Sequence, residues 1–254
     1  MTDHTLQGRT ASELHWFRRR RFLQAAAVWT GLGGIATAQA QGRGNVVELN
    51  GDALLNGAPL RPDQAIQPGD AISTGPGTRL TFVIGSDAFH VRQNSQLQFE
   101  AGNSASVVGV LRLITGAVGS VWGKGPERKI ITSTLTAGIR GTGVYTEVLP
   151  EPDGRSYLCN CYGLVQVSAG TEQVESRAEY HQAVWAEPAP RNGRSLTPAP
   201  AINHTDEELE YLAQLVDQRT AWQIAGKKGT KDKGYGGAEG YGSTTPPAPS
   251  RSQP

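Results

Sequence analysis

The chain has 254 residues, with 24 basic and 23 acidic side chains and a formal net charge of +1. This balance excludes the strong positive field that draws proteins to nucleic acids, and we expect no nucleic-acid partner. Two cysteines are too few for a disulfide framework, whereas 32 glycines and 15 prolines indicate frequent turns.

Residues 1–40 have the features of an export signal. Arg19, Arg20, Phe22 and Leu23 resemble the twin-arginine pattern, and a weakly apolar run follows them. The run ends in alanines at alternate positions, 36, 38 and 40, which is the pattern that a signal peptidase cleaves. We therefore expect a periplasmic protein. The alternative is an uncleaved anchor in the inner membrane, but the run is short and contains glycines, so we expect no stable membrane span after cleavage.

From residue 42 to residue 187 the pattern is that of β-strands. Apolar side chains alternate with polar ones around Leu80, Phe82 and Ile84, which would share one face of a strand. Turn signals recur about every 8–12 residues, and no run with helical periodicity interrupts them. The segment predicts an all-β domain, arranged as an antiparallel sandwich or in a solenoid-like way.

A glycine-rich stretch lies inside this β segment. It contains Gly138, Arg140, Gly141 and Thr142, with a β-like run on each side. Glycines at this density indicate a tight turn or the close approach of two strands. We interpret the stretch as a hairpin corner in which the arginine is held for structural reasons. Contact with a ligand is the alternative, because a guanidinium group suits carboxylates and carbonyls.

The run TLTAGIRGT at 134–142 resembles the signature of FecR-type periplasmic domains. The likeness extends to Asn50–Asp52, Gln67–Ile72 and Asn94–Ser95, and covers about residues 42–170. It implies the periplasmic part of a signalling protein, which passes the state of an outer-membrane transporter to a sigma factor and has an envelope protein as partner. Only about 20 residues precede the twin-arginine motif of the export signal, too few for the family's cytoplasmic sigma-binding domain. We therefore expect a periplasmic binding or signalling module without that domain.

No catalytic pattern accompanies the β segment. The nucleophile elbow, the zinc-protease helix and the phosphate-binding loop are all missing from the sequence. Asp52, Asp70 and Asp87 stand in turn contexts, where aspartate commonly caps its own turn. We therefore expect a protein that is not an enzyme.

Cys159 and Cys161 lie in a β-like run and would point to the same face of a strand. Three interpretations are open. They are buried thiols, or a disulfide cramped by the single residue between them, or ligands of a soft metal such as zinc or iron. His90, His181 and His204 are the histidines outside the export signal. His181 and His204 could complete a Cys₂His₂ set, so a second hypothesis is a periplasmic metal- or cofactor-binding protein.

The C-terminal part divides into three segments by composition. Residues 188–203 are rich in proline and predict a linker. Residues 204–225 predict one amphipathic helix, in which Thr205 and Glu208 form a capping box ahead of an apolar stripe. This helix either docks on the β domain or binds a partner protein. Residues 226–254 are rich in glycine, lysine, proline and serine, and we expect them to be disordered.

Overall fold

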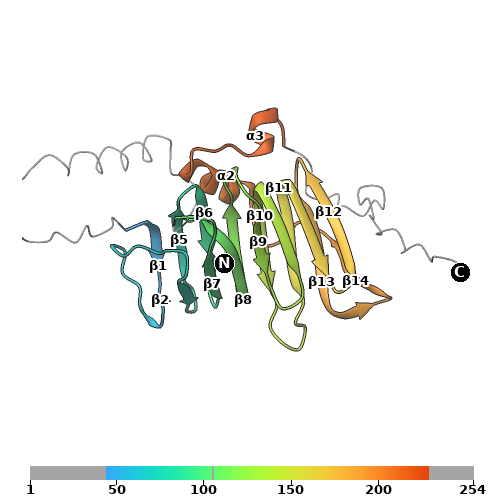
Figure 1. Cartoon of the computed structure of the whole chain (residues 1–254), viewed down its shortest axis with the longest axis horizontal. Coiled ribbons are helices and arrows are strands. Elements are labelled where there is room, and N and C mark those ends of the chain that lie inside the picture. Colours follow the sequence, from blue (N-terminus) through green and yellow to red (C-terminus); the bar gives the residue numbers. More distant parts are fainter. Residues whose placement is uncertain (1–43, 105, 229–254) are drawn as a thin grey trace, which may run out of the picture. The chain divides into compact units, whose positions relative to one another are not determined.

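The structure is a computed structural model, and it describes residues 44–104 and 106–228. The predicted export signal and all but the first three residues of the predicted tail lie outside this part of the chain. The described residues form a 14-stranded sheet followed by two short helices (Figure 1). This confirms the predicted all-β fold class with a C-terminal helical segment. None of the helices in the described ranges is long and apolar enough to cross a membrane.

The strands are short near both ends of the sheet and long in its middle. In chain order they are β1 (Val46–Asn50), β2 (Ala53–Leu55), β3 (Ala58–Pro59), β4 (Ala71–Thr74), β5 (Arg79–Ile84), β6 (Asp87–Val91), β7 (Gln96–Ala101), β8 (Val108–Val121), β9 (Arg128–Ile131), β10 (Thr136–Val148), β11 (Ser156–Ala169), β12 (Glu172–Ala178), β13 (Gln182–Arg191) and β14 (Arg194–Ala199). The helices are α2 (Asp206–Leu215) and α3 (Ala221–Ala225).

The long strands β8, β10 and β11 join two layers, because their two halves have different neighbours. The first half of β8 pairs with β7 and its second half with β6. Likewise β10 pairs first with β9 and then with β8, while β11 pairs first with β13 and then with β12. Among the described strands, all pairs are antiparallel except β8 with β9.

The main core lies between the two layers. Phe82 of β5 and Phe89 of β6 both contact the ring of Phe99 on β7, with centroids 5.7 and 5.0 Å apart. Trp122 adds an edge-to-face contact with Phe89 at 5.2 Å. These four side chains are fully buried. Because β7 is not paired with β5 or β6, these contacts show that the layers face each other.

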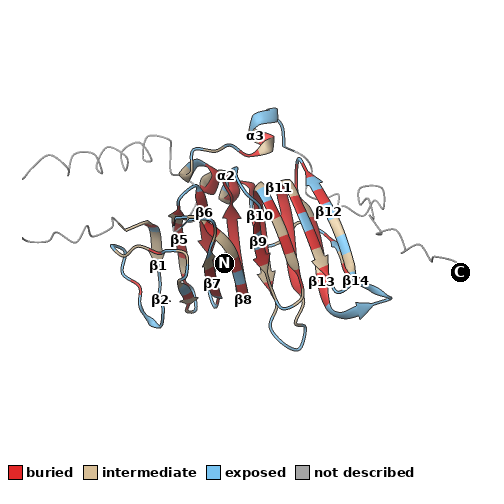
Figure 2. Ribbon diagram, in the orientation of Figure 1, coloured by how far each residue is buried: buried red, intermediate tan, exposed pale blue. Residues whose placement is uncertain are grey.

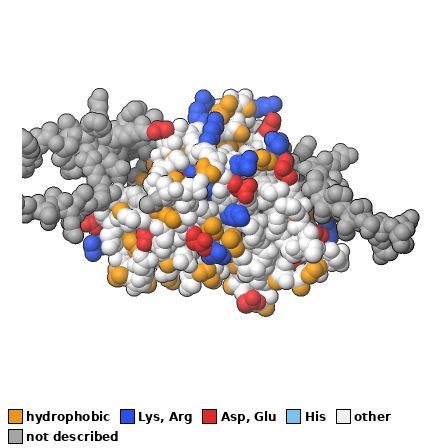
Figure 3. Space-filling view, viewed as in Figure 1, with side chains coloured by type: hydrophobic (Ala, Val, Ile, Leu, Met, Phe, Trp, Pro, Cys, Tyr) orange, Lys and Arg blue, Asp and Glu red, His pale blue; other side chains and the backbone are white. Residues whose placement is uncertain are grey.

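A second apolar cluster lies on the outer face of the layer that contains β6, β8 and β11. Consecutive residues of β11 show the alternation, since Leu158 belongs to the inner core and Cys159 to the outer cluster. Leu209 and Leu212 of α2 are buried in this outer cluster, so the helical segment docks on the β domain. Figure 2 shows buried residues in the strands beneath α2, and Figure 3 shows basic and acidic side chains intermingled over the helices.

The predicted linker at 188–203 is wrong over most of its length, because β13 runs to Arg191 and β14 occupies Arg194–Ala199. Proline is tolerated on the edge strand of a sheet, and one of the prolines that suggested a linker lies on such a strand. Pro198 is on β14, which has only β13 as a partner and is therefore an edge strand. An edge strand does not need every backbone N–H for the ladder.

The single helix predicted at 204–225 is divided in two. α2 ends at Leu215, and Asp217 has a left-handed φ of +56° that no helix interior accepts. Each helix begins with its own capping box. The predicted box of Thr205 and Glu208 begins α2, and a second box of Thr220 and Gln223 begins α3. The second box was overlooked in the sequence.

Candidate metal centre

Cys159 and Cys161 lie next to each other on the outer face of β11. β11 is an interior strand at this point, because Cys159 pairs with Tyr145 of β10 on one side and with Ala183 of β13 on the other. Both cysteines are completely buried. The ladders on both sides therefore fix the backbone at Cys159, whereas Cys161 lies where the register between β10 and β11 shifts.

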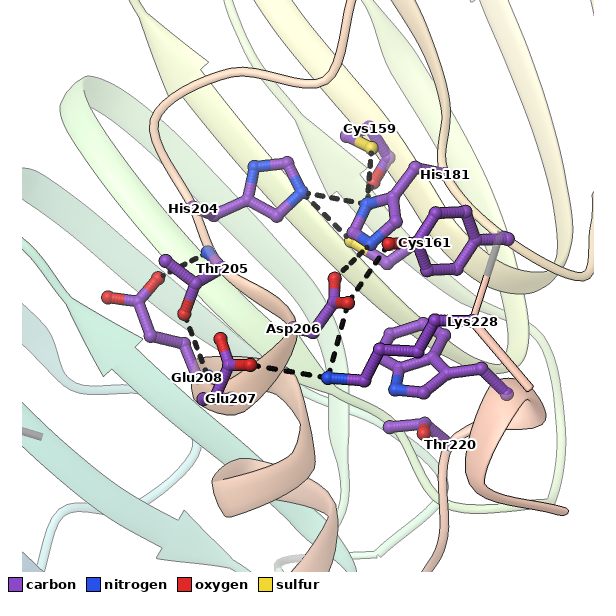
Figure 4. A network of polar contacts seen from close by, with 12 residues as sticks. Cys159, Cys161, His181, His204, Thr205, Asp206, Glu207, Glu208, Thr220 and Lys228 are labelled. Carbon is purple, nitrogen blue, oxygen red and sulfur yellow. Dashed lines mark hydrogen bonds and ion pairs between the residues drawn. The ribbon is translucent and has the colours of Figure 1, made fainter. Parts of the chain in front are cut away.

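His181 and His204 approach the cysteines from two other segments. His181 lies between β12 and β13, and its backbone N–H donates to the carbonyl of Cys161 over 3.0 Å. Its φ of +21° is unusual for a residue with a side chain. His204 lies between β14 and α2, next to the capping residue Thr205. Figure 4 shows these side chains converging from the sheet and from the segment ahead of α2.

The ligand atoms of these four side chains form a compact group. All of them lie within 4.8 Å of one another. His181 Nδ1 is 3.5 Å from Cys159 Sγ, and His204 Nε2 is 3.4 Å from Cys161 Sγ. The two ring nitrogens are 3.1 Å apart. The structure thus brings together the four residues that the sequence suggested as a Cys₂His₂ set.

In each imidazole, the ring nitrogen that points away from the cysteines faces a hydrogen-bond acceptor and therefore carries the proton. His181 Nε2 donates to Asp206 Oδ1 over 2.9 Å, and His204 Nδ1 donates to the carbonyl of Ile202 over 2.6 Å. A neutral imidazole has one donor and one acceptor nitrogen. His181 Nδ1 and His204 Nε2 therefore both present lone pairs to the centre. Two lone pairs at 3.1 Å repel each other unless a cation or a shared proton lies between them.

Three of the distances within the group suit a tetrahedral zinc ion. Zinc bonds of about 2.3 Å to sulfur and about 2.0–2.1 Å to nitrogen give tetrahedral edges of about 3.3 Å between nitrogens, 3.5 Å between nitrogen and sulfur, and 3.8 Å between sulfurs. The nitrogen–nitrogen distance of 3.1 Å and the nitrogen–sulfur distances of 3.5 and 3.4 Å lie close to these values. A cation at the centre would satisfy all four donors at once.

Asp206, the first residue of α2, orients the ring of His181 and is itself held by two partners. The hydroxyl of Tyr180 donates to Asp206 Oδ2 over 2.9 Å, and Lys228 Nζ lies 3.4 Å from the same oxygen. A carboxylate behind a metal-binding histidine is a common arrangement, because it fixes the ring and makes the inner nitrogen more basic. In the sequence, Asp206 stands out only as part of an acidic first turn, so this role was not predicted.

Aromatic rings hold both imidazoles in place. Tyr145 stacks on His204 with centroids 4.7 Å apart and an interplanar angle of 14°. Trp222 of α3 stacks on His181 at 5.3 Å and 24°. Because both rings are packed on one face and hydrogen-bonded at the outer nitrogen, the inner nitrogens have little freedom to turn away from the centre. No periodic signal in the sequence pointed to these stacking partners.

The cysteines are not joined by a disulfide in the structure. Burial raises the pKa of the Cys159 thiol, but hydrogen bonding with Cys161 and the nearby rings of His204 and His181 outweigh burial and hold that pKa well below its ordinary value. A depressed pKa favours the thiolate, which is the form in which cysteine binds metals. Of the three interpretations of the cysteines, the geometry favours metal ligands over a pair of inert buried thiols.

The glycine-rich stretch is not the hairpin corner that the sequence suggested. Gly138, Arg140, Gly141 and Thr142 all lie within the continuous strand β10, and the turn that joins β9 to β10 is at 132–135. Gly141 has a φ of +57° and marks a bulge, where the register with β11 shifts. A bulge allows the strand to bend from one layer to the other without ending.

Arg140 is exposed and not held as expected. Its side chain is 65% exposed, and its ion pair with Glu127 spans 3.9 Å. Exposed pairs of this kind contribute about 0–1 kcal/mol to stability. Thr142, by contrast, is completely buried. The glycines of this stretch allow the bulge in β10. The exposed side chain of Arg140 does not hold the strand in place.

His90 lies apart from the cysteine and histidine group. It is on β6, where its Nδ1 is 2.8 Å from the hydroxyl of Thr81 on the neighbouring strand. His90 was not among the predicted ligands, and the group of four does not include it.

Comparison with known proteins found two solved structures of limited similarity. No family model matches the chain, and no curated protein is similar to it. Two solved structures are similar, at 1.65 and 2.50 Å resolution, both of a "putative anti-sigma factor" from Parabacteroides distasonis ATCC 8503. Each has 11% identity and a TM-score of 0.41, and the match covers 50% of this chain and 57% of the other. This chain therefore matches little more than half the length of that protein.

Proposed function

We propose that this β domain is a non-enzymatic metal-binding module. One zinc ion, bound by Cys159, Cys161, His181 and His204, fastens the C-terminal helical segment to the sheet. The observation that carries the proposal is the pair of inward-facing imidazole nitrogens 3.1 Å apart, each fixed as an acceptor and each beside a cysteine sulfur. Sites of two sulfur and two nitrogen ligands in tetrahedral arrangement suit zinc better than other common metals.

The completeness of the ligand set supports a structural or regulatory role for the ion. A catalytic zinc keeps an open position for water or substrate, whereas a structural zinc has four protein ligands. Here four protein ligands are present, and all four are buried. This accords with the sequence, in which no catalytic pattern was found.

The proposed test compares two histidine variants for metal content. The full-length protein, purified without chelators and without metal-affinity resin, should contain about one zinc per chain by elemental analysis, with iron and copper measured in parallel. His204→Ala should lose most of this zinc, because it removes one ligand. His90→Ala is the matched control, a buried histidine outside the group, and should retain zinc. Equal metal content in all three proteins, or none in any, would refute the proposal.

The location in the periplasm is a proposal as well, and it is supported by Arg19, Arg20, Phe22 and Leu23 and by the resemblance to FecR-type domains. Twin-arginine export carries folded proteins, so the ion could be inserted before export. Replacing Arg19 and Arg20 with lysine should leave the protein in the cytoplasm, as cell fractionation would show. Unchanged periplasmic yield would contradict this route, and an intact N-terminus in the membrane fraction would favour the uncleaved anchor.

In the periplasm, the domain would serve as a binding or signalling module for another envelope protein. This part of the proposal rests on the resemblance of the run at 134–142 to the FecR signature. Release of the docked helical segment would change the surface that the domain presents.

A further inference from the structure

The C-terminal strap, defined here as residues 202–228, covers an apolar surface of the sheet. On the sheet side this surface is formed by Ala88, Ala117, Val121, Tyr145 and Tyr162, all of them buried. On the strap side Leu209, Leu212, Ala213 and Trp222 pack against it. A Cβ placed on Gly119 of β8 would be 3.6 Å from Leu212 Cδ1, so α2 lies directly on the strand. The strap therefore hides a surface that would otherwise face water.

Polar contacts between the strap and the sheet lie around its first residues. Arg92 of the β6–β7 turn donates to both carboxylate oxygens of Glu208, over 2.6 and 2.8 Å, and to the carbonyl of Asn203. Asn203 Nδ2 donates to Glu147 on β10 over 2.8 Å. Together with Asp206 and its bond to His181, these contacts place the start of α2 beside the candidate metal centre.

Of the four proposed ligands, only His204 belongs to the strap. Cys159 is fixed by the ladders on both sides of β11, Cys161 lies two residues further along the same strand, and the backbone N–H of His181 donates to the carbonyl of Cys161. Removing the ion breaks the coordination bonds that would join His204 to the other three ligands, whose donor atoms lie within 4.8 Å of one another. Because His204 is the one ligand on the strap, loss of these bonds weakens the attachment of the strap to the sheet.

We propose that the metal ion controls whether the strap covers this surface, and that the uncovered surface binds an amphipathic helix of a partner protein. This inference rests on the proposed function. The partner helix would have the pattern of α2, namely two leucines three residues apart with a glutamate just ahead of them. The leucines would take the places of Leu209 and Leu212, and the glutamate would pair with Arg92, which loses Glu208 when the strap leaves.

The first test measures hydrogen exchange of the full-length protein with zinc bound and after chelation. Peptides from 203–225 should exchange at least about tenfold faster once zinc is removed, and regain protection when zinc is restored. Peptides from β5 and β6 should keep their protection, and they serve as the internal reference. Loss of protection throughout the domain would overturn the inference, because the ion would then support the whole fold rather than the strap.

The second test uses a labelled synthetic peptide of residues 203–226 as the probe for the partner helix. It should bind the chelated protein at least about tenfold more tightly than the zinc-loaded protein, because the strap occupies its site in the latter. A matched peptide with Leu212→Asp should bind neither form. Equal binding to both forms, or no binding to the chelated form, would overturn the inference.

The outcomes separate this inference from the function on which it rests. If the purified protein contains no zinc, the proposed function fails first. If zinc is present and is removed by chelation, but residues 203–225 stay protected, the metal-binding function stands and control of the strap is refuted.

Discussion

Chelation of zinc will lower the melting temperature of the full-length protein by about 8–16 °C. An ion that binds only the folded state at a free concentration 1,000 times its Kd stabilises that state by about 4 kcal/mol. A domain of this size loses about 2–4 °C in melting temperature per kcal/mol. The four ligands come from three separate segments of the chain, so unfolding destroys the site and the binding energy becomes folding energy. Differential scanning calorimetry with and without a chelator measures the shift.

Cys161→Ala provides the control for this experiment. The variant lacks one ligand, and its melting temperature should be low from the start and insensitive to the chelator. An equal shift in the variant and in the unaltered protein would mean that the chelator acts elsewhere. An unchanged melting temperature after proven loss of zinc would contradict a role of the ion in stability.

Gly143→Ala will destabilise the domain by about 1–3 kcal/mol, because it overpacks a buried contact between β10 and β11. A Cβ at Gly143 would lie 2.4 Å from Cε1 and 2.9 Å from Cζ of the Tyr162 ring. The ring has little room to move, since it is buried and meets Trp222 edge-to-face with centroids 5.6 Å apart. Thermal or denaturant unfolding of the variant gives the size of the effect.

Gly138→Ala is the matched control on the same strand. A Cβ at Gly138 would lie 3.2 Å from the carboxyl carbon of Glu127, which is a flexible and partly exposed side chain. The change in stability should therefore stay within about 0.5 kcal/mol. In a Tyr162→Ala background, Gly143→Ala should cost little, because the clashing ring is gone. A similar cost in both backgrounds would show that the clash with Tyr162 is not the cause.

The all-β fold could be predicted from the sequence, but the layering could not. Alternation around Leu80, Phe82 and Ile84 follows from the two-residue period of a strand, which is a local property. The bend of β10 depends on its bulge at Gly141 and on a change of partner from β9, its neighbour in the sequence, to β8, which is further away. The same glycines indicate a turn or a bulge equally well, and this is why the hairpin corner was predicted in the wrong place.

The candidate ligands could be predicted because cysteine and histidine are scarce in this chain. Cys159 and Cys161 share a strand face by period alone, and only three histidines lie outside the export signal. What the sequence could not provide was the hairpin of β13 and β14, which carries the chain from His181 back to His204. Its prolines suggested a linker, although an edge strand accepts them. The bond from His181 to Asp206 depends on that return path and was therefore missed.

The most direct measurement of the central claim is the zinc K-edge X-ray absorption spectrum of the purified protein. The proposed site predicts a first shell of two sulfur atoms at about 2.3 Å and two imidazole nitrogens at about 2.0–2.1 Å from the metal. Any zinc that His204→Ala retains should have one imidazole fewer in its first shell. A spectrum with only oxygen and nitrogen neighbours would mean that any zinc present is bound elsewhere, and it would contradict the Cys₂His₂ centre.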